Sequence, residues 1–180
     1  DAMELFGRAA AYGRRVDLRH GVRASFHEAG HILGSASVLL EVAEGGRTRR
    51  ILFSGDVGPR ERPLLSSPAP PGDADVVVLE STYGDRDHRS LDDSVDEFHA
   101  AVRDADARGG NVIIPTFALE RAQELLFYLR EGMQSGAIQK GLRVFLDSPM
   151  AISATRILGR HPDAMKPEIA AMIRGGTDPF

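Results

Sequence analysis

His-Glu-Ala-Gly-His, at residues 27–31, is the stretch that decides how this chain is interpreted, because it predicts two different zinc sites. By itself it matches H-E-x-x-H, in which two histidines on one helical turn bind zinc and the glutamate is the general base of a metalloprotease. Together with the sequence that follows, only His31 is a ligand, in a site whose other ligands come from separate segments. We favour this second interpretation, in which His27 is incidental.

The metalloprotease interpretation requires a stable helix across residues 27–31. Gly30 and Gly34 lie in or beside that stretch, and residues 24–42 show no long apolar stripe. Glycine is one of the least favourable residues in a helix interior. A protease of this kind also needs a third ligand, and no candidate lies in a recognisable signature. A zinc metalloprotease therefore stays an alternative.

The composition is that of a globular protein without cysteine. The 180 residues are 42% hydrophobic and 27% charged, and the formal charge of −4 argues against a generally basic nucleic-acid wrapper. It does not exclude a nuclease, since metal ions and a local basic groove can bind phosphate. Without cysteine, a zinc site must use histidine and carboxylates. No apolar run reaches ~18 residues and no signal peptide is visible, so we predict a cytoplasmic protein without a membrane segment.

The first half of the chain predicts β-structure. β-Rich runs at residues 37–42 and 50–53 flank Gly45-Gly46, which indicates a hairpin. The four prolines within residues 63–72 predict an irregular loop. Residues 75–80 form a nearly continuous apolar run, which is typical of a strand buried on both faces.

The second half predicts alternating strands and helices. We expect helices at residues 90–108, 119–131, 152–158 and 168–173, strands at 111–117 and 143–146, and a further short helix at 1–11. Gly109-Gly110 is a typical helix end. The alternation predicts a parallel α/β layer, with a boundary near residues 85–89.

Five motifs follow one another in an informative order. They are Gly-His-Ile-Leu-Gly-Ser at 30–35, Ser-Gly-Asp at 54–56, Glu-Ser-Thr-Tyr-Gly at 80–84, Pro-Thr-Phe-Ala-Leu-Glu-Arg-Ala-Gln-Glu-Leu-Leu at 115–126 and Asp-Ser-Pro-Met-Ala at 147–151. In this order they closely resemble the β-CASP branch of the metallo-β-lactamase superfamily. That branch contains RNA-processing nucleases, including the nuclease subunit of the pre-mRNA cleavage and polyadenylation machinery. Each motif alone is weakly specific, whereas the order of all five is strong.

The resemblance implies a role for three residues. His31 matches a zinc ligand, Asp56 matches the aspartate that bridges two zinc ions, and Glu80 matches the acidic residue that opens the β-CASP region and orients a histidine proton donor. We expect all three to meet at one edge of the sheet, as active-site residues of α/β proteins do. Two cations held by a bridging carboxylate suit in-line phosphoryl displacement.

Most other candidates are predicted to be structural. Arg121 and the Ser-Pro-Met turn at 148–150 could touch phosphate or bases, but helix packing and a turn explain them more economically. The remaining histidines, His20, His88, His99 and His161, are predicted to be surface or capping residues.

The chain lacks part of what the resembled family uses. The H-x-H-x-D-H metal motif and the histidines that follow the β-CASP region are absent from the sequence. Because a catalytic zinc needs three protein ligands and an open position, we predict that this chain alone is inactive and binds metal poorly. It also begins at Asp1 rather than Met, and we expect a piece of a longer protein.

The resulting prediction is an α/β fold in two parts. Residues 1–84 would be the second part of a metallo-β-lactamase αββα sandwich, and residues 85–180 the first part of a β-CASP parallel-sheet domain. The parent protein is expected to be a ribonuclease with two zinc ions that hydrolyses single-stranded RNA to a 3′-hydroxyl and a 5′-phosphate. A DNA-acting nuclease of the same branch and an inactive scaffold member stay alternatives. Internal or terminal cleavage, and homodimerisation of the parent, are left open.

Overall fold

The computed structural model describes residues 9–180 and divides into two compact units. Unit 1 consists of Asp1–Arg62 and Ser66–Asp85, and unit 2 of Pro63–Leu65 and Arg86–Phe180. Most of the short helix expected at residues 1–11 lies outside the described residues, and residues 9–11 are not helical.

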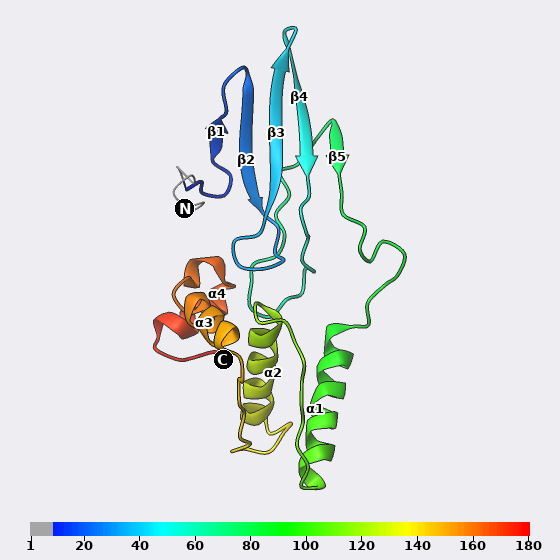
Figure 1. The fold of residues 1–180 in the computed structure, drawn as a ribbon, viewed down its shortest axis with the longest axis vertical. Coiled ribbons are helices and arrows are strands. Elements are labelled where there is room, and N and C mark those ends of the chain that lie inside the picture. Colours follow the sequence, from blue (N-terminus) through cyan, green and yellow to red (C-terminus); the bar gives the residue numbers. More distant parts are fainter. Residues whose placement is uncertain (1–8) are drawn as a thin grey trace. The chain divides into compact units, whose positions relative to one another are not determined.

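Unit 1 is built on a five-stranded sheet whose strands follow chain order (Figure 1). The strands are β1 (Arg15–Asp17), β2 (Val22–Glu28), β3 (Ala36–Glu44), β4 (Arg47–Phe53) and β5 (Val76–Val78). Neighbours from β1 to β4 are antiparallel, and β5 runs parallel to β4. The predicted hairpin is confirmed: Gly45 and Gly46, with φ of 57° and 75°, connect β3 to β4. Positive φ at both central residues is the geometry of a tight hairpin turn whose twist matches that of the strands.

The two faces of this sheet differ in polarity. Register places Phe26 opposite Val38 and Leu40 opposite Ile51, which makes one face apolar. The other face is mixed: Arg23 lies opposite Glu41 and Glu41 opposite Arg50, whereas the buried Leu39 lies opposite Leu52. Side chains alternate between faces with period two, so a one-residue slip would exchange the residues of the two faces.

β5 forms where it was predicted, but its burial was predicted wrongly. Val76, Val77 and Val78 are 46%, 54% and 49% exposed. Within the described residues β5 is an edge strand and pairs with β4 alone, with Ile51 opposite Val76. A hydrophobic run shows that a strand suits burial on both faces, but the covering layers must come from other elements.

Unit 2 contains the predicted helices. They are α1 (Leu91–Ala107), α2 (Arg121–Ser135), α3 (Pro149–Leu158) and α4 (Pro167–Arg174), with a 3₁₀ turn, η2 (Pro162–Ala164). Ser90 caps α1 by accepting a 3.1 Å hydrogen bond from the N–H of Asp93, which satisfies one of the free donors of the first turn. Gly109, with φ of 66°, follows the end of α1 as predicted. No helix within residues 9–180 combines the length and the apolar character that a bilayer span requires.

The contact between α1 and α2 is built on a small core of Val102, Leu129 and Ile138. His99 belongs to this interior: it is 6% exposed, and its Nε2 lies 2.9 Å from the carbonyl oxygen of Tyr128. The prediction that His99 is a surface or capping residue is therefore wrong. His99 lies one position from the apolar stripe of α1, and at this position its ring contacts α2.

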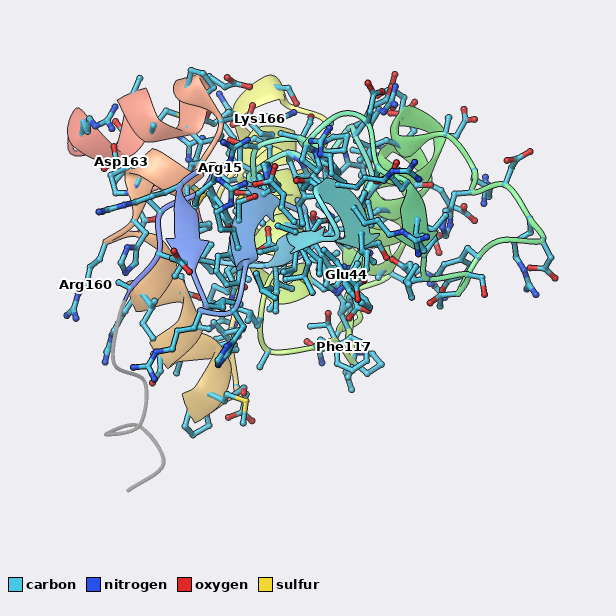
Figure 2. All side chains as sticks on the ribbon, turned by 90° about the horizontal axis from the view of Figure 1, so that it is seen from above. Arg15, Glu44, Phe117, Arg160, Asp163 and Lys166 are labelled. Carbon is cyan, nitrogen blue, oxygen red and sulfur yellow. The ribbon has the colours of Figure 1, made fainter. Side chains whose placement is uncertain are left out.

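Two predicted strands of unit 2 are extended but unpaired segments. Residues 111–117 and 143–146 have no ladder partner among the described residues. Ile113, Phe117 and Phe145 are 90%, 83% and 80% exposed, and the Phe117 side chain projects from the ribbon (Figure 2). Apolar β-propensity needs a neighbouring strand to become a sheet. The sheet of unit 1 and the helices of unit 2 confirm the α/β class, whereas these two segments are not strands here.

Three residues of the proline-rich loop after β4, Pro63–Leu65, belong to unit 2. Leu64 and Leu65 are almost completely buried. The carbonyl oxygen of Leu64 accepts a 2.8 Å hydrogen bond from the N–H of Lys166, and Leu65 forms a bridge with Met165. The loop is irregular, as predicted, but two of its residues are core residues.

Candidate active site

Three loops of unit 1 meet at one end of the sheet. The loop after β2 carries His31, the loop after β4 carries Asp56, and the segment after β5 carries Glu80. Backbone hydrogen bonds join neighbouring loops: Gly58 N–H donates to Ala29 O at 2.8 Å, and Ser54 N–H donates to Val78 O at 2.9 Å. The structure therefore brings together the three segments that the sequence singled out.

Glycine is required where the first two loops touch. A Cβ atom at Gly58 would lie 1.7 Å from the carbonyl oxygen of Gly30. Gly30 itself has a φ of 62°, and a Cβ there would lie 2.8 Å from Cδ of Pro68. Because neither glycine has a side chain, the backbones approach closely enough for the Gly58–Ala29 hydrogen bond to form.

The backbone of His31 is fixed on both sides of its Cα. Its N–H donates to Oγ of Ser35 at 3.0 Å. Its carbonyl oxygen accepts a 2.7 Å hydrogen bond from the guanidinium of Arg62. These two bonds fix the point from which the His31 side chain leaves the backbone.

Glu80 connects β5 to the loop of Asp56. Its Oε1 accepts a hydrogen bond from the N–H of Val57 at 2.5 Å, and its Oε2 accepts one from the hydroxyl of Thr82 at 2.7 Å. These bonds stabilise the charged form, and together with the weaker effect of His31 they lower the pKa of Glu80 below its usual value. Glu80 is thus an ionised carboxylate at neutral pH, beside the loop of Asp56.

Asp56 itself is exposed at the start of this loop. Together, His31 and Asp56 offer an imidazole nitrogen and a carboxylate, which are donor types that zinc accepts. Within residues 9–180, no group of three or more histidine, aspartate or glutamate side chains is arranged to hold a metal ion. The described residues therefore fit the chemistry of a metal site but do not complete one.

The helix needed by the H-E-x-x-H interpretation does not form. His27 and Glu28 are the last two residues of β2, and His27 lies opposite Ser37 of β3. The Nε2 of His27 lies 2.9 Å from Oγ of Ser25, and burial, with a smaller contribution from the charge of Arg50, lowers the pKa of His27. Two residues of a strand followed by a glycine turn cannot present His27 and His31 on one helical turn. The metalloprotease alternative is therefore wrong.

Sequence reasoning missed several polar residues that hold these loops. Oγ of Ser54 accepts a 3.0 Å hydrogen bond from the N–H of Glu80, while Thr82 and the N–H of Val57 fix its carboxylate. Ser54 and Thr82 do lie inside the quoted motifs, so their position beside the acidic residues was the available signal.

Comparison with known proteins agrees with this geometry. A ribonuclease of Thermus thermophilus is 38% identical over 185 residues, covering 100% of this chain and 40% of the relative. The Beta-Casp domain family model matches residues 122–180, within unit 2. Residues 122–180 belong to the Beta-Casp domain family.

Further relatives come from distant organisms. Cleavage and polyadenylation specificity factor 73 of Drosophila melanogaster is 34% identical over 154 residues, covering 85% of this chain and 22% of the relative. An RNase J-like protein of Methanocaldococcus jannaschii is 31% identical over 175 residues, covering 94% of this chain and 39% of the relative. The chain therefore spans less than half the length of each of these relatives.

Proposed function

We propose that this chain forms one edge of the active site of a longer zinc-dependent ribonuclease that hydrolyses phosphodiester bonds of single-stranded RNA. The observation that carries the proposal is the junction of the His31, Asp56 and Glu80 loops at one end of the sheet, joined by backbone and carboxylate hydrogen bonds. The relatives support RNA as the substrate, since two are named ribonucleases or RNase-like and a third is a cleavage and polyadenylation factor.

Each of the three residues would have a different task. His31 and Asp56 would hold the metal, with Asp56 shared between two zinc ions. Bound zinc supplies positive charge that activates water and stabilises the oxygens of the transferring phosphoryl group. Glu80 would stay ionised and orient a histidine proton donor, because each of its oxygens has a second lone pair beyond the bonds to Val57 and Thr82.

The two units support a domain assignment. We propose that unit 1 belongs to the second part of a metallo-β-lactamase αββα sandwich and unit 2 to the first part of a β-CASP domain, as predicted for residues 1–84 and 85–180. The Beta-Casp match within unit 2 supports this division. The exposed apolar side chains of β5, and of Phe117 and Phe145, are consistent with further layers in a longer protein.

The test is Asp56→Ala in the full-length protein that contains this chain. We expect RNA cleavage to be abolished while the circular dichroism spectrum stays unchanged, because Asp56 is exposed and its side chain supports no packing. Glu44→Ala, which removes an exposed carboxylate at the hairpin end of β3 (Figure 2), is the matched control. Retained cleavage by Asp56→Ala would refute the proposal.

The substrate and the compartment need separate measurements. Single-stranded RNA and single-stranded DNA of one sequence, compared at equal concentrations, separate the proposal from a DNA-acting nuclease. Absence of cleavage of either substrate by the wild-type protein would favour an inactive scaffold member. The proposal includes the cytoplasmic location expected from the sequence, which cell fractionation tests.

A further inference from the structure

Glu28, the glutamate of the H-E-x-x-H stretch, has no role in the proposed chemistry but has well-defined hydrogen-bond partners. It is the last residue of β2, and its Oε1 accepts a 2.8 Å hydrogen bond from the N–H of Gly30. Because Gly30 has a φ of 62°, its N–H turns away from the strand ladder and back towards the Glu28 side chain. The carboxylate thus stabilises the turn that separates β2 from His31.

Tyr12 lies against the same carboxylate. Tyr12 is 43% exposed, but partial burial of its hydroxyl, followed by the nearby charge of Glu28, raises the pKa of Tyr12 to about 12. The single proton of the Tyr12 hydroxyl is donated to the carbonyl oxygen of Ser35 at 2.8 Å. Tyr12 therefore holds Ser35, at the end of the loop, with its hydroxyl near Glu28, at the beginning of the loop.

Ser35 makes hydrogen bonds to other residues of the same loop. Its Oγ accepts hydrogen bonds from the N–H of His31 at 3.0 Å and from the N–H of Ile32 at 3.2 Å. Its carbonyl oxygen accepts a 3.3 Å bond from the N–H of Ala29 as well as the Tyr12 hydroxyl. Hydrogen bonds to Ser35 thus close the loop at residues 29–35. Tyr12 bonds to Ser35, and Glu28, the last residue of β2, bonds to Gly30 within the loop.

We propose that Glu28 and Tyr12 are positioning residues that set the backbone of the loop at residues 29–35 and thereby aim His31 at the metal. The inference rests on the proposed function, because it takes His31 as a ligand. It gives Glu28 a task different from that of a general base: Glu28 contacts neither the metal nor the substrate and acts through the Gly30 N–H. Groups that orient a ligand typically change metal affinity by about 10–100-fold when they are removed.

The hydrogen bond to Gly30 needs an acceptor oxygen at position 28 rather than a charge. Glu28→Ala removes that acceptor, and we expect zinc affinity to fall by about 10-fold, at the lower end of the range for orienting groups because the contact is through the backbone. Glu28→Gln keeps an oxygen of the same reach and should retain affinity close to the wild type. Tyr12→Phe leaves Glu28 in place but releases Ser35, so affinity should fall by a smaller factor of about 3, from one lost neutral hydrogen bond partly replaced by water.

The experiment measures zinc affinity of the full-length protein by competition with a chromophoric chelator. Melting temperatures of the zinc-free variants are measured in parallel, and Glu44→Ala is the matched control. A positioning role lowers zinc affinity in Glu28→Ala and Tyr12→Phe, restores it in Glu28→Gln, and leaves kcat at saturating zinc close to the wild type. If Glu28→Ala does not fold, Tyr12→Phe and Glu28→Gln carry the comparison.

His31→Ala distinguishes failure of this inference from failure of the proposed function. If His31→Ala loses zinc while Glu28→Ala binds it like the control, the positioning role is refuted and the proposed function stands. If His31→Ala keeps its zinc affinity, the proposed ligand is wrong, and the inference is refuted with it. Glu28→Gln as weak as Glu28→Ala would overturn the hydrogen-bond explanation.

Discussion

Oε1 of Glu80 accepts a hydrogen bond from the backbone N–H of Val57, with an N–Oε1 distance of 2.5 Å. This bond links the residue that follows Asp56 to the segment that follows β5, the strand next to β4. Oγ of Ser54 completes the junction by accepting from the N–H of Glu80. The position of Asp56 thus depends on an acidic side chain from another motif. This coupling explains why motifs far apart in sequence act as one site.

Substituting Glu80 should weaken this junction in a pH-dependent way. The pKa of Glu80 is lowered in the folded protein, so its contribution to stability is present above the unfolded-state pKa, near 4.5, and is lost as the pH falls through the folded-state pKa. Glu80→Gln should therefore melt at a lower temperature than the wild type at pH 7, and the difference should vanish in acid. Melting curves from pH 7 to pH 2 test this, with Glu44→Gln as the control. A difference independent of pH would contradict the assignment.

Gly58→Ala should disrupt the same site by steric conflict. The added Cβ would meet the carbonyl oxygen of Gly30 at 1.7 Å. Cβ is fixed on its Cα and the oxygen belongs to the backbone, so no side-chain rotation relieves the conflict. Overpacking of this kind costs about 1–3 kcal/mol or more. Denaturant unfolding measures the loss, and zinc binding of the full-length protein should fall as the two loops separate. Gly159→Ala, where the nearest atom to the added Cβ is 3.7 Å away, is the control and should cost much less.

Gly132→Ala tests the interior of unit 2. Its Cβ would lie 2.7 Å from Nε2 of His99, whose ring is held by its hydrogen bond to Tyr128 O. Alanine gains about 1 kcal/mol in helix propensity over glycine, but the clash of about 1–3 kcal/mol should outweigh this gain. The double variant with His99→Ala should relieve the clash, so the two effects should not be additive. Additive unfolding free energies would contradict the contact.

Tyr128→Phe should be neutral or slightly stabilising. The Tyr128 hydroxyl is buried, and no hydrogen-bond partner for it lies among the described residues. Burial, and then the charge of Glu124, raise the pKa of Tyr128 to about 12. Removing an unsatisfied buried hydroxyl of the same shape costs nothing and can recover up to about 1 kcal/mol. Chemical denaturation should show an unchanged or higher midpoint, and loss of stability above 1 kcal/mol would reveal a partner.

The 180-residue chain on its own should carry little zinc. His31 and Asp56 are two donors, and residues 9–180 contain no arrangement of three. After purification and exchange into zinc-free buffer, elemental analysis should give a zinc-to-protein ratio near zero. A ratio near one would show a complete local site and would refute the split-site proposal.

The sequence by itself determined the elements whose physical basis is local. Gly45-Gly46 specified the β3–β4 hairpin through positive φ, Ser90 and Gly109 bounded α1, and helical spacing placed α2, α3 and α4 within a few residues. The order of the motifs also sufficed to indicate the family and to predict that the segments carrying His31, Asp56 and Glu80 meet at one edge of the sheet. These features depend on residue type and spacing, which the sequence states directly.

Only the tertiary structure decided which apolar runs are paired or covered, and which polar groups meet. Residues 111–117 have the composition of a strand, but strand pairing depends on a partner elsewhere in space. β5 is exposed for a related reason, since burial depends on neighbouring layers. Likewise, Glu28 was compatible with a helical general base until β2 placed it beside Gly30 and Tyr12. Long-range contacts are set by the geometry of the whole fold, so no local pattern specifies them.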